Sequence, residues 1–479
     1  MSKFKQLLSD TFVYGISSVL TRFINLLLLP LYTRVLTPSE YGVLNILNTT
    51  FSITWLIALL ALDSASFVFF HDKDDLKYRK SVFSSWFWLQ TASSVFIATI
   101  ILIFAGFFSE IFFSTKEYKT EFSLIALLLL ANLLPNIVWN WFRSLRKVKA
   151  TAVFTLVQSL IIIGLNIWLI VGLKWGVKGF FIAQLASGAI MSIASMLILK
   201  DWIRPVFFSK TLLNGMLKYS LPLVPTAIAT WGLSSVGGYF IQAFRGTAEV
   251  GLYQTGVTMS GLLTFVIASF TQAWGPFALS IKNEQGAKEF YGKVFILYVS
   301  VIGFIAASVT VFSSELLSIA VAPSYSGSHW VMSLLCFNAM VIGLNYIASI
   351  GLNLAKDMRP FAKAIIIGSV INLFFYYFGA KYFGKEGCAL ASMLSNLGIV
   401  FFIFIYAQKK VFIPFDFGKG GVIGLFCIAL AFCIKFLVPL SDYLSIVLKA
   451  VSILGLLMGL LYVNRIEVIS GLKKIGVIK

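Results

Sequence analysis

The stretch Thr11–Tyr32 reads TFVYGISSVLTRFINLLLLPLY, an almost unbroken apolar run with one arginine, Arg22, near its middle. A run of about 20 mainly apolar residues predicts a membrane-spanning helix. A guanidinium near the bilayer centre costs roughly 2.5–3.5 kcal/mol on insertion scales, so such a residue usually faces an anion or a water-filled cavity. Ser18, Arg22 and Asn25 follow at steps of four and three and share one helix face. The stretch therefore predicts a membrane transporter with a polar interior.

The rest of the chain has the same apolar character. Of its 479 residues 59% are hydrophobic and 12% are charged, whereas charged residues make up about 25% of soluble proteins. Segmenting the chain at about 20 residues per helix predicts about fourteen spans, centred near residues 21, 53, 94, 133, 162, 189, 230, 262, 302, 342, 370, 397, 428 and 453. The connections are too short for a separate catalytic domain. We expect an all-α integral membrane protein that is not an enzyme.

Basic residues are distributed unevenly between the two sides of the predicted membrane. Loops and termini on one side hold 27 of the 38 Lys and Arg residues, the opposite loops hold 10, and Arg22 is the one that remains. The positive-inside rule places the basic side, with both termini, in the cytoplasm. These residues are spread over eight helix edges near the lipid head groups and form no single patch, so membrane lipids, and not nucleic acid, are the expected partners.

The chain repeats itself after 209 residues. TPSEYG at 37–42 corresponds to GTAEVG at 246–251, and Asn136 corresponds to Asn345. Two later loops match as well, GLKWGVKG at 172–179 and GAKYFGKEG at 379–387. The second of these loops has one additional residue and follows the first by 207 to 208 residues. Together the three matches indicate an internal duplication. Because six spans separate the copies, both copies enter the membrane from the same side, which is a parallel repeat.

The repeat predicts the domain organisation. We expect two six-helix lobes, residues 1–205 and 206–410, around a central cavity. Residues 411–479 fall outside the repeat and are expected to form two additional membrane helices and a cytoplasmic tail. Transporters with such repeats bind their substrates at the interface between the repeats.

Asp63 is a candidate partner of Arg22. At a rise of 1.5 Å per residue, Arg22 and Asp63 lie roughly 15 and 12 Å from the cytoplasmic ends of their spans. Asp63 could therefore balance Arg22 in the absence of substrate, or bind a coupling cation. The alternative is that Asp63 only caps a helix break and faces cytoplasmic water.

Two predicted helices carry stripes of polar side chains. One stripe consists of Asn132, Asn136, Asn140 and Arg143, and the other of Asn338, Asn345, Ser349 and Asn353. The steps of three and four place each set on one helix face. Such carboxamides could line a path for a sugar-bearing substrate, or they could hold helices together. Arg143, near the cytoplasmic end, could instead extend its charge to the membrane surface.

Three short motifs carry a family resemblance. RFINLLLLPLYTRVLTPSEYG at 22–42, LDSA at 62–65 and GVKG at 176–179 resemble the polysaccharide repeat-unit (O-antigen) flippases of the multidrug/oligosaccharidyl-lipid/polysaccharide exporter superfamily. The resemblance implies that the protein moves undecaprenyl-pyrophosphate-linked oligosaccharide from the cytoplasmic to the outer leaflet of the bacterial inner membrane. Alternating access between the lobes, coupled to H+ or Na+, is implied as well. The product would serve O-antigen, capsule or exopolysaccharide assembly, with the polysaccharide polymerase and chain-length regulator as candidate protein partners.

The resemblance also implies a site. Cationic residues of the cavity would hold the pyrophosphate, with Arg22 as the match. The proposed substrate-binding set is Arg22, Asn25, Asn136, Asn140, Arg143, Asn345 and Ser349, with Asp63 for ion coupling and no cofactor or metal. The alternatives are a cation-coupled small-molecule or drug exporter, an integral-membrane enzyme of glycan assembly, and a scaffold protein. A cavity arginine disfavours a drug exporter that binds lipophilic cations, and the short loops disfavour the enzyme.

Overall fold

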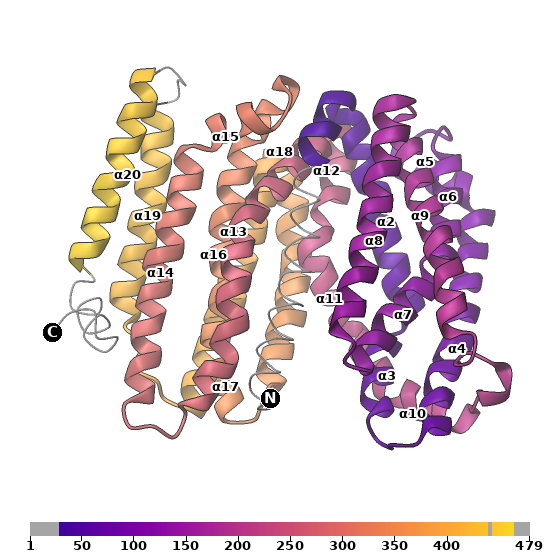
Figure 1. Ribbon diagram of the computed structural model, residues 1–479. Helices are drawn as coiled ribbons and strands as arrows, with labels where there is room; N and C mark the ends of the chain where they lie inside the picture. Colours follow the sequence, from indigo (N-terminus) through magenta and orange to yellow (C-terminus); the bar gives the residue numbers. More distant parts are fainter. Residues whose placement is uncertain (1–27, 439–442, 464–479) are drawn as a thin grey trace. The chain divides into compact units, whose positions relative to one another are not determined.

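The computed structural model describes residues 28–438 and 443–463, and in these two ranges the regular structure is entirely helical (Figure 1). Arg22 and Asn25 lie outside the described residues. The chain divides into two compact units, Met1–Gly251 and Leu252–Lys479. The lobe boundaries at 205 and 410 were inferred from the repeat and not from compactness, so they stay a prediction.

The first unit consists of helices joined by short turns. In chain order they are α2 (Pro38–Leu59), α3 (Leu62–Phe70), α4 (Leu76–Ile103), α5 (Ala105–Phe113), α6 (Lys119–Ala131), α7 (Leu133–Ser144), α8 (Val148–Asn166), α9 (Gly176–Leu199), α10 (Lys210–Ser220), α11 (Val224–Ser235) and α12 (Gly237–Arg245). Residues 28–35, before α2, are also helical. A π-helical turn, Ile167–Gly172, extends α8.

Local sequence explains where α2 begins. Thr37 is the N-cap, and its side chain accepts a hydrogen bond from the backbone amide of Glu40. The Glu40 carboxylate accepts one from the Thr37 amide at 2.8 Å. This reciprocal capping box satisfies two amides that the first turn of a helix leaves without partners, and Pro38 at the first helical position has no amide hydrogen to satisfy.

Two interruptions position the side chains discussed below. Leu60 and Ala61 both adopt left-handed backbone angles, with φ of 51° and 53°, and separate α2 from α3. Such angles are uncommon for residues other than glycine. Asn132 separates α6 from α7, and its side chain turns back to donate a hydrogen bond to the Leu128 carbonyl at 3.0 Å. The first break places Asp63 at the start of a new helix, and the second is followed by a short helix that carries the carboxamides of Asn136 and Asn140.

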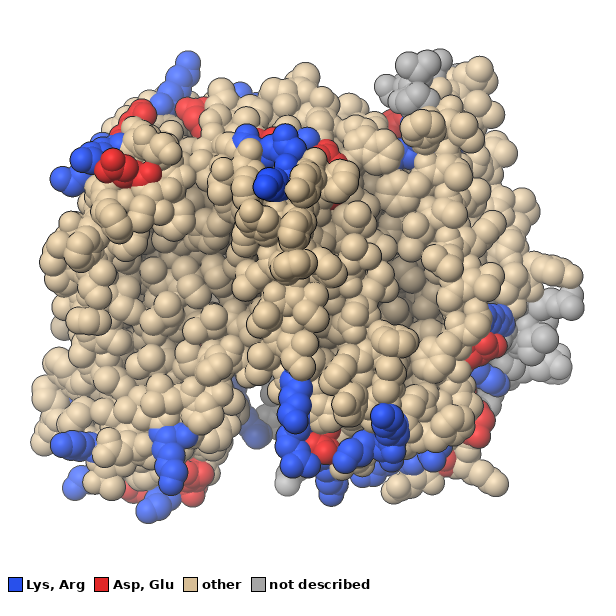
Figure 2. Space-filling model, turned by 180° about the vertical axis from the view of Figure 1, so that it is seen from behind, with Lys and Arg blue, Asp and Glu red and all other residues tan. Residues whose placement is uncertain are grey.

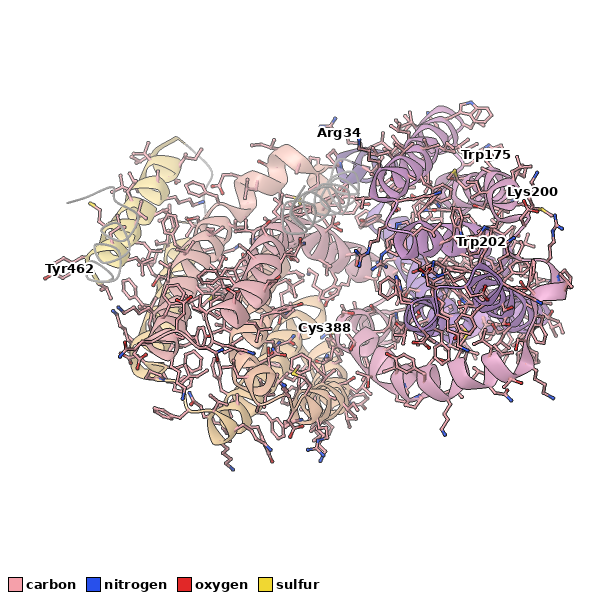
Figure 3. The ribbon with its side chains drawn as sticks, turned by 60° about the horizontal axis from the view of Figure 1, so that its bottom comes forward. Arg34, Trp175, Lys200, Trp202, Cys388 and Tyr462 are labelled. Atoms are coloured by element: carbon pink, nitrogen blue, oxygen red, sulfur yellow. The ribbon has the colours of Figure 1, made fainter. Side chains whose placement is uncertain are left out.

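An aromatic cluster forms part of the core of the first unit. Trp202 is labelled in Figure 3. Its ring stacks on Phe70, with centroids 6.4 Å apart, and meets Phe83 and Trp141 edge to face at 6.0 and 5.3 Å. Edge-to-face pairs at these distances bring the positive ring edge to the negative ring face. The cluster ties α3, α4 and α7 to the segment that follows α9.

The second unit contains the later helices. They are α13 (Thr247–Ser280), which begins in the first unit, α14 (Ala287–Val311), α15 (Ser313–Ala320), α16 (His329–Ala348), α17 (Ile350–Leu354), α18 (Arg359–Lys410), α19 (Phe417–Leu437) and α20 (Tyr443–Val463). A 3-10 turn, Pro323–Ser328, precedes α16. Helices α14, α19 and α20 lie side by side (Figure 1).

The described ranges contain 11 helical segments that are long and apolar enough to cross a membrane. One of them, α18, has 52 residues with a non-helical Gly384 inside, and it covers both expected spans centred near 370 and 397. The expected span near 230 is divided between α11 and α12, and the span near 21 lies outside the described residues. On the face in Figure 2, charged side chains gather near the helix ends and a broad band between them is mostly uncharged. The predicted all-α membrane fold is confirmed.

Candidate functional site: an aromatic and carboxamide pocket

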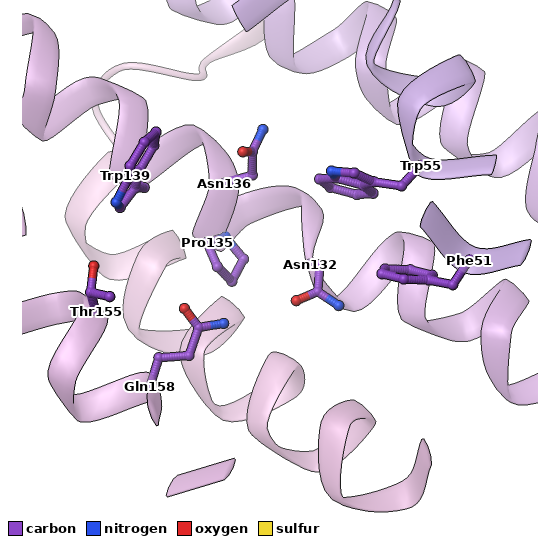
Figure 4. Close-up of a pocket in the computed structure, with 8 residues that line it drawn as sticks. All are labelled: Phe51, Trp55, Asn132, Pro135, Asn136, Trp139, Thr155 and Gln158. Carbon is purple, nitrogen blue, oxygen red and sulfur yellow. The ribbon is translucent and has the colours of Figure 1, made fainter. Parts of the chain in front are cut away.

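A pocket of about 270 Å³ lies among α2, α7 and α8 of the first unit. Its lining residues are Phe51, Trp55, Asn132, Pro135, Asn136, Trp139, Thr155 and Gln158 (Figure 4). Asn136 lies eight residues before the end of α7, roughly 12 Å along the helix axis, and Thr155 lies roughly 10 Å from the start of α8. The pocket is therefore inside the hydrocarbon depth that these helices cross.

Aromatic rings form two walls of the pocket. Phe51 and Trp55, one turn apart on α2, are stacked with centroids 6.1 Å apart and planes at 25°. Trp139 comes from α7, on the other side of the carboxamides (Figure 4). The Trp139 side chain is 36% exposed, and those of Phe51 and Trp55 are half-buried. The rings thus present apolar faces to whatever occupies the pocket.

The carboxamides of Asn132 and Asn136 lie between these walls. Asn132 donates one amide hydrogen to the Leu128 carbonyl at 3.0 Å. The Asn136 amide nitrogen is buried and has no hydrogen-bond partner among the described residues. Buried polar groups are nearly always paired, and an exception indicates a missing ligand or water. Asn136 is therefore a donor available to a ligand.

Asn140 positions Asn136. Its amide donates to the Asn136 carbonyl at 3.0 Å and approaches the Asn136 side-chain oxygen at 3.5 Å. Asn140 itself is buried, with 7% of its surface exposed. It does not line the pocket, so its contact with a ligand would be indirect.

Arg143 lies beside the pocket through Trp139. Its guanidinium carbon is 4.4 Å from the Trp139 ring centroid, within the range of a cation–π interaction. The Arg143 side chain is exposed. The Arg143 charge thus contacts the Trp139 ring, which lines the pocket together with the carboxamides. In the predicted orientation this charge is near the cytoplasmic end of α7.

Asp63 lies in the first turn of α3, next to the break at Leu60 and Ala61. The N-cap of this helix has no side-chain hydrogen bond. A carboxylate in the first turn interacts favourably with the helix dipole, and among the described residues it forms no ion pair. Both earlier interpretations, a partner for Arg22 and a cap at a break, stay predictions.

The polar stripe of the second unit is packed differently. Asn338 accepts a hydrogen bond from Asn396 of α18 at 3.0 Å, which joins two helices. Asn345 is buried, and its side-chain oxygen has no partner among the described residues. The Ser349 hydroxyl donates to the Tyr346 carbonyl at 3.3 Å. Neither Asn345 nor Ser349 is among the residues that line the pocket of the first unit.

Sequence reasoning missed most of the pocket. It found Asn132 and Asn136 through their spacing, but not Phe51, Trp55 and Trp139, which resemble ordinary core or lipid-facing aromatics. The available signal was the four-residue step between Phe51 and Trp55 on a helix opposite the carboxamide stripe. In the described part of the chain, no three His, Cys, Asp or Glu side chains lie close enough together to hold a metal ion.

The first unit thus combines helices that are long and apolar enough to cross a membrane with a polar and aromatic pocket. Residues 7–282, more than half of the chain, match the family described as Polysaccharide biosynthesis protein, and the chain belongs to this family. This confirms the family resemblance. No curated protein sequence matches the chain.

Solved structures of transporters share the fold. The lipid II flippase MurJ, in an inward closed conformation, superposes with a TM-score of 0.75 at 14% identity, covering 96% of this chain and 100% of that chain. An inward-facing multidrug resistance MATE family transporter of the MOP superfamily gives 0.60 at 16% identity, covering 84% and 94%. A MATE structure in complex with MaL6 gives 0.51 at 15% identity, covering 84% and 93%. At these low sequence identities, the similarity shows a shared fold.

Proposed function

We propose that the protein is a flippase that moves undecaprenyl-pyrophosphate-linked oligosaccharide repeat units from the cytoplasmic to the outer leaflet of a bacterial inner membrane. The observation that carries the proposal is the pocket among α2, α7 and α8, where aromatic faces flank carboxamides at membrane depth. Family membership supports a role in polysaccharide biosynthesis, and the fold of a lipid II flippase supports a lipid-linked substrate.

The chemistry of the pocket suits a sugar. A sugar ring has apolar C–H faces and a polar rim of hydroxyls. Trp55 and Trp139 offer rings to those faces, and Asn132 and Asn136 offer both donors and acceptors to the rim. Binding sites of this kind combine a mostly apolar wall with a few placed polar groups. The Asn136 amide nitrogen, which has no partner among the described residues, gains a hydrogen bond on sugar binding.

The pyrophosphate needs positive charge. In this proposal Arg22 and Asn25 of the first span bind it, and Arg143, held against Trp139, contributes from the cytoplasmic side. Outward movement of negative charge across an inside-negative membrane gains about 2.3 kcal/mol per charge per 100 mV. Transport is then sensitive to the membrane potential unless a cation that moves in the opposite direction cancels the charge.

Alternating access and ion coupling complete the proposal. Asp63 binds the coupling ion, H+ or Na+, or pairs with Arg22 when substrate is absent. Asn345 and Ser349 contribute from the second lobe when the two lobes close on the substrate. Both termini are cytoplasmic, and the polysaccharide polymerase and chain-length regulator receive the product on the outer side.

A cation-coupled exporter of small molecules is the second candidate, because the chain also shares the fold of a MATE family transporter. An aromatic pocket would suit a planar drug as well. The two functions differ in what accumulates when the protein is absent. Loss of a flippase leaves glycan lipid on the cytoplasmic leaflet, whereas loss of an exporter changes drug resistance and leaves glycan lipid unaffected.

The test is the leaflet location of lipid-linked repeat units, measured with a membrane-impermeant sugar label on spheroplasts. Cells carry no protein, the wild type, Trp55→Ala or Trp168→Ala, in a strain without a second flippase. Trp168 is 60% exposed and does not line the pocket, so Trp168→Ala is the matched control. We expect labelling with the wild type and the control, and little without the protein or with Trp55→Ala. Equal labelling in all four strains would favour the exporter.

A further inference from the structure

A second polar site lies in the second unit, at the end of α19. Lys435 of α19 and Lys449 of α20 are 5% and 2% exposed, although both helices are apolar enough to cross a membrane. Ammonium groups at such positions are rare, face the protein interior and mark functional sites. Sequence reasoning did not single out either lysine.

The Lys435 ammonium is surrounded by neutral acceptors. It donates to the hydroxyls of Ser313 and Ser333, the latter at 2.7 Å, and to the His329 carbonyl at 3.0 Å. The Trp330 ring lies 4.8 Å away and adds a cation–π contact. These groups orient the ammonium and bring no negative charge to balance it.

The two lysines differ in their charged contacts. The carboxylate of Glu315, on α15, pairs with Lys449, whereas the hydrogen-bond acceptors of Lys435 are neutral. A charged group away from water is unfavourable unless an opposite charge lies close to it. An anion that enters the site would stabilise the Lys435 ammonium.

A cavity beside the lysines can hold such an anion. It measures about 340 Å³ and is lined by Ser314, His329, Trp330, Lys435, Phe436 and Lys449. The ring nitrogen Nδ1 of His329 is buried and has no partner among the described residues, so it can donate to an oxyanion. The volume greatly exceeds the ~30 Å³ that one water occupies in the liquid. One carboxylate oxygen of Glu315 is also unpaired, and it would repel an anion on its own side.

The rim of the cavity is apolar. Phe436 and the adjacent Leu437 are each 76% exposed, at the end of a helix that crosses the membrane. Acyl chains cover such side chains in a bilayer, and a phosphate group lies next to the end of the chains. The Lys435 ammonium is therefore within reach of a lipid head group and also shielded from bulk water.

We propose that the cavity bounded by Lys435, Lys449 and His329 binds the phosphate group of an anionic membrane lipid, on the outer side in the predicted orientation. The phosphate fits between the two ammonium groups and accepts a hydrogen bond from His329, while the acyl chains lie along Phe436 and Leu437. This site shares no lining residue with the proposed sugar pocket, and the inference does not depend on the proposed function.

The test uses purified full-length protein in detergent. Binding of phosphatidylglycerol, phosphatidylcholine and inorganic phosphate is measured by native mass spectrometry and by the rise in melting temperature. Phosphatidylglycerol is expected to bind and to raise the melting temperature, while phosphatidylcholine and free phosphate have little effect. Equal effects of both lipids would overturn the inference, and equal binding of free phosphate would overturn its assignment to a lipid.

Single substitutions test whether phosphatidylglycerol binds in this cavity. Lys435→Met is expected to weaken phosphatidylglycerol binding by about tenfold or more, the equivalent of one charge-assisted hydrogen bond. Lys381→Met is the matched control, because Lys381 is exposed, lies in α18 and is predicted to face the same side. Glu315→Gln removes the competing negative charge and is expected to tighten binding. If Lys435→Met does not fold, the Glu315→Gln variant provides the test. Phosphatidylglycerol binding to Glu315→Gln that is unchanged or weaker than binding to the wild type would contradict the inference.

Discussion

Gly42 and Gly251, which occupy equivalent positions of the 209-residue repeat, lie against each other's helices where α2 and α13 begin. A Cβ on Gly42 would be 1.8 Å from the carbonyl oxygen of Thr247, and a Cβ on Gly251 would be 1.9 Å from that of Pro38. Pro38 and Thr247 are also 209 residues apart. The contact is therefore reciprocal, as in a two-fold interface, and only glycine allows the two backbones to approach so closely.

Alanine at either glycine is expected to destabilise the protein. The clash is with backbone atoms, which cannot rotate away, so Gly42→Ala and Gly251→Ala should each lose about 1–3 kcal/mol, the usual range for overpacking. Because both substitutions widen the same contact, their effects should add incompletely. Thermal unfolding in detergent measures this. Gly261, also on α13, has no atom within 4 Å of its Cβ position, so a loss as large in Gly261→Ala would refute the packing argument.

Asn136 and Asn338 should respond oppositely to leucine. The Asn136 amide has no partner among the described residues, so Asn136→Leu removes an unsatisfied group and should keep or raise the melting temperature. It should also slow transport about 2- to 10-fold, through one lost hydrogen bond to the substrate. Asn338→Leu deprives Asn396 of an acceptor and should cost about 1–3 kcal/mol of stability. Comparable loss of stability in both variants would show that Asn136 is structural.

Asp357 should confer stability that depends on pH. Hydrogen bonds from Arg359 and Lys410 hold the pKa of its carboxyl well below the ordinary value, with oxygens 2.9 and 3.2 Å from the two partner nitrogens. A carboxyl with a depressed pKa stabilises the fold above its ordinary pKa of about 3.9, and this contribution is lost as pH falls towards the folded pKa.

Asp357→Asn is therefore expected to lower the melting temperature at pH 7, and the difference from the wild type should shrink below about pH 4. Melting curves at pH 7, 5 and 3 measure the effect. Glu117→Gln, on an exposed residue outside the helices, controls for the loss of a negative charge. A difference that stays constant down to pH 3 would exclude the ion-pair explanation.

Asp63→Asn tests ion coupling. If Asp63 binds the coupling ion, the Asp63→Asn substitution should abolish the dependence of transport on the H+ or Na+ gradient. The variant should still fold, because Asp63 forms no ion pair among the described residues. Initial rates with and without each gradient measure this. Transport that keeps both its rate and its gradient dependence would limit Asp63 to a role at the helix break.

Features that depend on long apolar segments could be predicted from sequence. Span centres were readable because each helix must supply about 20 apolar residues, and the repeat was readable because Gly42 and Gly251 keep their spacing. The break at Leu60 and Ala61 could not be predicted from the sequence. Neither residue ordinarily adopts left-handed backbone angles, and here the surrounding packing imposes these angles.

The candidate sites were predicted only in part. The carboxamide stripe followed from helical spacing, but which aromatic rings face it depends on how α2 packs against α7, which local sequence does not encode. Lys435 and Lys449 were not predicted as site residues, because charged residues near helix ends usually extend to water. Their burial depends on Ser313, Ser333 and Glu315, which are more than one hundred residues away in the chain.

The most direct test of the account is translocation by the purified protein in liposomes. Undecaprenyl-pyrophosphate-linked oligosaccharide is placed in one leaflet, and its appearance in the other is followed with an enzyme that cannot cross the bilayer and cleaves the sugar. We expect the wild type and Trp168→Ala to move the lipid, and Trp55→Ala and Asn136→Leu to move it several-fold more slowly. Equal rates in empty liposomes and in those with wild-type protein would contradict the proposed function.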